Sequence, residues 1–190
     1  MKNIAIIIGL VLFNMFAVNA QAPSFEDFKA QFAAATLPFS MTTETLIAQE
    51  ASAAKAKRLG WDFYQFLPEL ERSAKASNMP VYPEPVAVFE TEDRVAFLYN
   101  IARGLNKGAK SYAITLYDRQ GAYIATNYVG GINAKYITSL SVDANLMASV
   151  QQMDRSTEMV SAQMIDLSVP GNPDQLEWST VEVKTLSAKK

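Results

Sequence analysis

The stretch that decides the fold is residues 111–129, SYAITLYDRQGAYIATNYV. It holds two runs rich in aromatic and β-branched residues, and Asp118-Arg119-Gln120-Gly121 separates them. Such runs are typical of strands, and glycine in the last turn position permits a positive φ that other residues rarely adopt. The stretch therefore predicts an antiparallel hairpin with strands at 111–117 and 122–129.

The same pattern continues on both sides of this hairpin. About eight strands at a spacing near ten residues are typical of an antiparallel meander joined by tight turns. The strand over 94–103 is apolar on both faces at Val95-Ala96-Phe97-Leu98-Tyr99, so both of its faces need cover. We predict a hairpin turn at Gly130-Gly131. The other predicted strands cover 86–90, 132–142, 146–153, 159–167 and 176–186.

The residues before the meander are predicted to be helical and to supply that cover. Ser24 suits the N-cap position of a first helix, and Phe25, Phe28 and Phe32 recur at the spacing of one helix face. That helix is expected to end before Leu37-Pro38, because the residue before a proline avoids helical angles. We expect Phe28 to be buried against the sheet or a neighbouring helix.

These patterns define the fold class as α+β. N-terminal helices over about 24–77 pack on an antiparallel β-meander of about eight strands over about 86–186. The alternative is a closed up-and-down β-barrel with N-terminal helices.

The first twenty residues have the layout of a secretory signal peptide. A basic start at Met1-Lys2-Asn3 precedes an apolar run over 4–18, and Val18-Asn19-Ala20 suits a signal peptidase. A membrane anchor is the alternative, but a spanning helix needs about 20 apolar residues and this run is shorter. We therefore expect cleavage after Ala20, a single domain over 21–190 without a transmembrane segment, and a periplasmic or extracellular location.

The composition excludes several kinds of chemistry. The chain has no histidine and no cysteine, so it has no disulfide, no Ser-His-Asp or Cys-His arrangement and no imidazole or thiolate metal ligand. The net charge of −2 without a basic cluster argues against nucleic-acid binding. Glu90, Glu92 and Asp93 cluster at one predicted turn, but their spacing does not place two carboxylates across a cleft. We predict no catalytic residue, no metal site and no cofactor.

The tyrosines are the best candidates for a binding surface, since five of the eight lie between Tyr112 and Tyr136. Successive side chains of a strand point to opposite faces. A turn at 118–121 then places Tyr123 on an apolar core face and Tyr117 on the opposite face, where a tyrosine ring can stack on a ligand. The alternative is that the tyrosines of this opposite face lie under a helix. The predicted ligand-binding residues are Tyr117, Tyr128, Asn133 and Lys135.

The layout resembles a group of small exported proteins of Bacteroidetes-type bacteria. The resembling parts are Phe25-x-x-Phe28-x-x-x-Phe32, Leu37-Pro38-Phe39 and the tyrosine-rich strands around Tyr117-Asp118-Arg119-Gln120-Gly121. The resemblance implies export and a helix-plus-meander fold, and it implies no reaction and no site residue.

Taken together, the sequence predicts a secreted, non-catalytic binding protein or envelope-associated accessory protein. Its expected partner is an envelope component, a glycan or a peptide. A small-ligand carrier with a barrel cavity is one alternative, which an enclosed apolar cavity would favour. A small carboxylate-dependent hydrolase is another, which two acidic residues facing each other across a cleft would favour.

Overall fold

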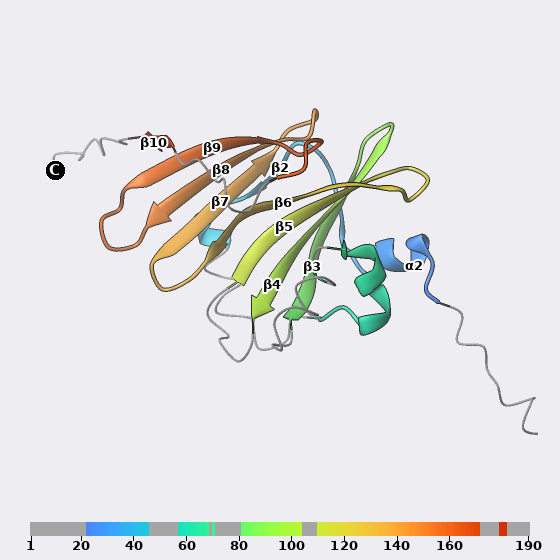
Figure 1. Cartoon of the computed structure of the whole chain (residues 1–190). Coiled ribbons are helices and arrows are strands. Elements are labelled where there is room, and N and C mark those ends of the chain that lie inside the picture. The colour runs from blue at the N-terminus through green and yellow to red at the C-terminus, as the bar shows by residue number, and fades with distance from the viewer. Residues whose placement is uncertain are drawn as a thin grey trace, which may run out of the picture.

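An antiparallel meander forms most of the computed structural model (Figure 1). The structure describes residues 22–45, 57–68, 70, 81–103, 110–171 and 179–181. Each strand from β4 onward pairs antiparallel with the strand before it, which confirms the predicted meander. The sheet stays open, so the closed-barrel alternative is wrong. The strands are β3 (Val81–Glu90), β4 (Arg94–Arg103), β5 (Lys110–Asp118), β6 (Tyr123–Ile132), β7 (Tyr136–Val142), β8 (Met147–Asp154), β9 (Val160–Asp166) and β10 (Ser179–Val181).

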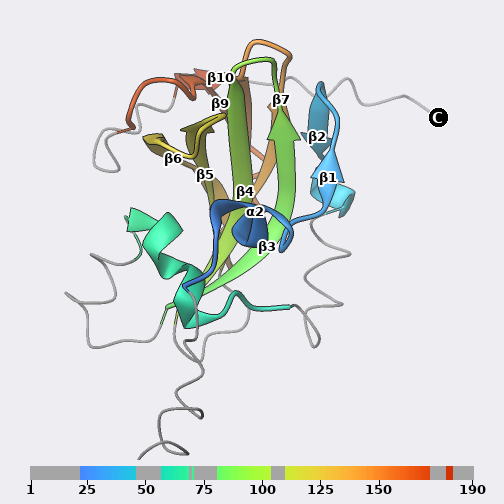
Figure 2. The ribbon, with the colours of Figure 1, turned by 90° about the vertical axis from the view of Figure 1, so that its right-hand side faces the viewer.

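Two short N-terminal strands extend this sheet. β1 (Ala34–Ala35) runs parallel to β3, and β2 (Phe39–Met41) runs antiparallel to β7. Only one residue pair, Ile132 with Ile137, connects β6 to β7 in the sheet register. The sheet therefore divides into a first half-sheet, β3–β6, and a second half-sheet, β7–β10 with β2 beside β7 (Figure 2).

One apolar cluster joins the inner faces of the two half-sheets. Leu98 of β4 and Ile114 of β5 belong to the same cluster as Val142 of β7 and Val150 of β8, and all four are buried. Burial of such side chains contributes about 1.5–3 kcal/mol each. Because alternate residues of a strand point to opposite faces, the inner cluster also decides which residues face outward.

Two short helices cover the outer face of the first half-sheet, and Figure 2 shows the first of them in front of β3 and β4. They are α2 (Phe25–Lys29) and the 3-10 helix η2 (Trp61–Phe66). Ser24 caps α2 as predicted, because its hydroxyl accepts a hydrogen bond from Asp27 N at 3.1 Å. Phe28 is 0% exposed and packs in a second apolar cluster with Phe97, which confirms its predicted burial.

The first helix is shorter than the sequence predicts. The Ala33 carbonyl accepts a hydrogen bond from Val88 N at 2.9 Å, and Ala34-Ala35 then pair with β3. These residues satisfy their backbone groups in the sheet and not in another helical turn. Residues 46–56 and 71–77 of the helical region expected over about 24–77 fall outside the described residues.

The meander begins earlier than predicted, because β3 starts at Val81 and includes Pro83 and Pro85. Proline lacks a backbone N–H, so it is tolerated where a strand has no second strand beside it. β1 reaches only Val88 and Phe89 of β3, which leaves the proline-containing part at an edge of the described sheet.

The predicted turn at Gly130-Gly131 is wrong, since both glycines lie inside β6. The turn follows at 133–135, where Asn133 N donates to Tyr136 O at 2.9 Å. Gly130 has a φ of +100°, and a Cβ there would overlap the side chain of Thr138. The glycines therefore permit close contact between neighbouring strands where β6 meets β7, and they do not form a turn.

Candidate functional site

Tyr117 lies under the helices and not on an open face. It is 3% exposed, its ring centroid is 5.1 Å from that of Phe25, and its hydroxyl donates to the carbonyl of Phe66. Burial raises the pKa of Tyr117 above its ordinary value. The side chain therefore occupies the alternative position that the sequence left open, against a helix.

The four predicted ligand-binding residues do not come together. Tyr128 is half-buried against the same helix-covered cluster as Tyr117. Asn133 and Lys135 are exposed in the β6–β7 turn, where the Asn133 side chain accepts from Lys135 N and Tyr136 N, both at 2.8 Å. Asn133 shapes the turn in this arrangement.

A β-bulge explains why the predicted faces differ from the observed ones. Leu116 pairs with Ala125, but the next residue, Tyr117, pairs with Tyr123 and skips Ile124. One extra residue reverses the side of every residue beyond it. The assignment of Tyr123 to the core face is therefore wrong: its ring lies on the side of Tyr117, with 5.9 Å between the centroids.

Buried hydroxyl groups cross β4, β5 and β6 on this same side. Tyr99 lies 3.0 Å from Thr115, and Thr115 lies 2.9 Å from Thr126, in each case between hydroxyl oxygens. Tyr123 donates to Thr126 at 3.3 Å. The members of the row satisfy one another, so the row is explained by the stability of the first half-sheet.

The predicted acidic cluster at the β3–β4 turn is engaged in ion pairs. Glu90 lies 2.8 Å from the Lys29 ammonium and also contacts the Arg119 guanidinium. The Lys29 hydrogen bond is the main cause that lowers the pKa of Glu90. These contacts hold α2, the end of β3 and the β5–β6 turn together. Within the described ranges, no group of three or more acidic side chains suits a metal ion.

A second ion pair is almost buried at the other end of the first half-sheet. Lys110 and Glu84 are 2.9 Å apart, with side chains 10% and 8% exposed. Asn100 lies opposite Glu84 in the register, and its side-chain oxygen is buried without a hydrogen-bond partner. A buried ion pair stabilises little by itself, because desolvation offsets the attraction between the charges. This polar cluster ends the apolar inner face near the β4–β5 connection.

The described residues form a pocket of about 270 Å³ on the outer face of the second half-sheet. Leu140, Val142 and Val150 point into the core, so the residues between them on β7 and β8 face outward. Six of the ten lining residues carry a hydroxyl group, which both donates and accepts hydrogen bonds. The lining residues are Ser40, Met41, Thr42, Thr43, Glu44, Ser139, Leu140, Ser141, Ser149 and Gln151.

The strand register arranges these polar groups in rows. Ser40 of β2 pairs with Ser141 of β7, which pairs with Ser149 of β8. Ser139 and Gln151 pair in the next outward-facing row. Neighbouring strands lie about 4.8 Å apart, so the first row offers three hydroxyls across about 10 Å. This spacing suits a ligand with several hydrogen-bonding groups along its length.

The charge of the pocket is negative. Glu44 is the charged residue in the lining, and hydrogen bonding to Thr42 lowers the pKa of its carboxyl group. The carboxyl is therefore ionised at neutral pH. A single carboxylate does not supply the pair of acidic groups that glycoside hydrolysis needs. The arrangement is suited to binding.

The fold and the pocket together define an open, helix-covered β-sheet protein with a hydroxyl-lined outer face. No family model, curated protein or solved structure matches the chain. Among the described residues, no helix has the length and apolar character needed to cross a membrane.

Sequence reasoning missed this pocket, although its strands carried a usable signal. Polar residues alternate with apolar ones at 139–142 (SLSV) and at 148–151 (ASVQ), which marks one polar face on each strand. The same alternation is typical of any solvated strand face, so it does not identify a site. The pairing of β2 with β7 is what adds the third wall, and sequence periodicity does not show it.

Proposed function

We propose that this chain is an exported, non-catalytic binding protein that holds a glycan of the cell envelope in the pocket across β2, β7 and β8. The observation that carries the proposal is the lining, in which hydroxyls and one amide face outward from paired strands and the Glu44 carboxylate lies just after β2. Glycans present many hydroxyls, and serine and threonine hydroxyls complement them because they act as both donors and acceptors. Export is expected from the apolar segment over 4–18 and the cleavage pattern at Ala20.

A catalytic role has less support from this pocket. Acid–base hydrolysis of a glycosidic bond requires two carboxylates on either side of the bond, and Glu44 is the carboxylate that lines the pocket. Glu90, one of the predicted acidic residues, forms ion pairs with Lys29 and Arg119 on the first half-sheet. Binding without turnover is therefore the function that the geometry favours.

The test is to fill the pocket and measure binding. Ser141→Trp places a large side chain between Ser40 and Ser149, on an exposed position where stability should change by only about 0.5 kcal/mol. Gln120→Trp, in the exposed β5–β6 turn, is the matched control. Isothermal titration with neutral, cationic and anionic oligosaccharides should show binding by the unmodified protein and by the control.

We expect Ser141→Trp to lose this binding by at least about tenfold, or about 1.4 kcal/mol. Unchanged affinity in Ser141→Trp would place the ligand elsewhere. The absence of binding to every oligosaccharide, or binding to extended peptides in their place, would overturn the proposal.

A further inference from the structure

Along one row of the outer face of the second half-sheet, polar side chains are followed by an apolar one. The first row continues beyond the pocket, because Ser149 of β8 pairs with Met164 of β9. Met164 is 61% exposed, so three hydroxyls are followed by an uncovered thioether side chain. A pyranose ring has an apolar face as well as hydroxyls, and a methionine side chain can adapt its shape to such a face.

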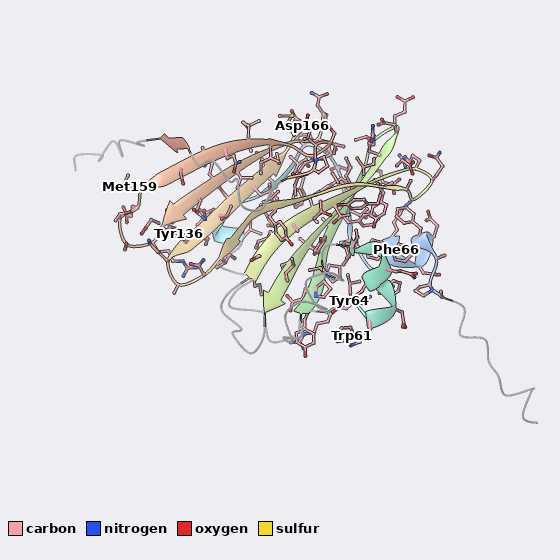
Figure 3. All side chains as sticks on the ribbon, viewed as in Figure 1. Trp61, Tyr64, Phe66, Tyr136, Met159 and Asp166 are labelled. Atoms are coloured by element: carbon pink, nitrogen blue, oxygen red, sulfur yellow. The ribbon has the colours of Figure 1, made fainter. Side chains whose placement is uncertain are left out.

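The strands of this face carry no cation. β2, β7, β8 and β9 read FSM, YITSLSV, MASVQQMD and VSAQMID, without a single Lys or Arg. The two carboxylates of these strands, Asp154 and Asp166, lie near opposite ends of the half-sheet. Figure 3 labels Asp166 at one end and, at the other, Met159, which follows Asp154 in the β8–β9 turn. A ligand on this face meets negative charge from Glu44 and from Asp166, which lies on the outer face opposite Met147.

Both carboxylates are ionised near neutral pH. A hydrogen bond from Thr42 lowers the pKa of Glu44, and a hydrogen bond from the Ser168 hydroxyl, 2.6 Å away, lowers the pKa of Asp166. Like charges repel and opposite charges attract, so an anionic glycan is disfavoured here and a cationic one is favoured.

We propose, on the basis of the binding function above, that the pocket prefers a glycan with free, protonated amino groups, and that an ammonium group lies beside Glu44 while an apolar sugar face lies over Met164. Glu44 is then the residue that determines the charge preference, and the serine rows hold the sugar whatever its charge. The two contributions are separable, because only the first requires a charge on the ligand.

The experiment compares three oligosaccharides of similar length by isothermal titration at about pH 5.5, where a glutamate is ionised. Oligomers of glucosamine are cationic, oligomers of N-acetylglucosamine are neutral, and oligomers of galacturonic acid are anionic. An exposed ion pair contributes little, so the cationic oligomer should bind up to about fivefold more tightly than the neutral one. The anionic oligomer should bind most weakly, and added salt should reduce the differences.

Glu44→Gln should reduce the ratio of the affinity for the cationic oligomer to the affinity for the neutral one, because it removes the carboxylate charge from the pocket lining and leaves that of Asp166 on the same face. Glu92→Gln, which removes a carboxylate from an exposed turn of the first half-sheet, should retain the preference. Equal binding of the neutral and cationic oligomers, or a preference that Glu44→Gln does not reduce, would overturn this inference and leave the glycan-binding proposal standing. Failure of all three oligomers to bind would overturn both.

Discussion

The two half-sheets use the same alternating strand pattern and differ in what meets their outer faces. On β4 of the first half-sheet, Val95, Phe97 and Tyr99 point away from the inner core and are buried under the helices. On β7 of the second half-sheet, Ser139 and Ser141 occupy the equivalent positions and line an open pocket. The comparison teaches that the polarity of the outward-facing residues of a strand indicates whether another element covers that face.

Charge is distributed in the same unequal way. In the first half-sheet, its turns and α2, the cations Lys29, Arg94, Lys110 and Arg119 each take part in an ion pair. The strands of the second half-sheet contain no Lys or Arg. Charges on the first half-sheet hold elements together, whereas the second half-sheet presents small polar groups to solvent.

Removal of an aromatic ring under the helices should have the largest effect on stability, because the first half-sheet depends on helix cover. Phe28 packs 4.7 Å from Phe97 between ring centroids and is fully buried. Phe28→Ala removes a buried aromatic ring, and we expect the free energy of unfolding to fall by about 3–5 kcal/mol in denaturant titrations. A change below about 1 kcal/mol would show that the helices contribute little to the first half-sheet.

The junction between the half-sheets is the next most sensitive place. Gly130 has a φ of +100°, and its backbone lies against Thr138. Gly130→Ala should lower the free energy of unfolding by about 1–3 kcal/mol, because alanine is strained at this φ and its Cβ meets Thr138. Gly60→Ala is the control, since a Cβ there has only an ordinary contact at 3.9 Å. Equal effects of the two substitutions would argue against a tight junction.

Loss of the buried Tyr117 hydroxyl should lower the free energy of unfolding by less than the two substitutions above, and the loss should depend on pH. Tyr117→Phe removes its hydrogen bond to Phe66 O and should cost about 0.5–1.5 kcal/mol at neutral pH. Because burial raises the pKa of folded Tyr117, the stability that the neutral phenol provides is complete below about pH 10 and is lost as the pH rises above it. Unfolding titrations from pH 8 to 11 should show a shallower alkaline loss in Tyr117→Phe than in the unmodified protein.

The contribution of Tyr99 must be separated in that measurement. Burial also raises the pKa of Tyr99, so Tyr99→Phe and the double variant complete the series. A wild-type stability that stays constant across the alkaline range would contradict the prediction for both tyrosines.

The smallest stability effect is expected on the open face. Ser149→Ala removes one hydroxyl from the pocket without removing core volume, and the midpoint of thermal unfolding should shift by an amount that corresponds to less than about 0.5 kcal/mol. Oligosaccharide affinity should fall in the same variant. A large loss of stability would show that the serine rows support the sheet and are not free to bind.

Local sequence patterns predicted much of the strand order. The bounds of β4 match the prediction at both ends, because its apolar core and the flanking turns are strong local signals. Ser24, Phe28 and Gly121 also have their predicted roles, and each role depends on neighbours within a few residues or on hydrophobicity alone. The net charge follows from the sequence directly, and the signal peptide stays a prediction that rests on the sequence only.

Tertiary structure decided the features that depend on distant partners. The bulge at Ile124 places Tyr123 on the face opposite to the predicted one. Gly130 and Gly131 lie in a strand against Thr138 and Lys110, whereas the sequence predicted a turn there. The pairing of Phe39–Met41 with β7 created the pocket from serines that look like ordinary surface residues in the sequence. The physical reason is that hydrophobic alternation specifies which residues can be buried, whereas register and pairing are specified by contacts that only the folded chain makes.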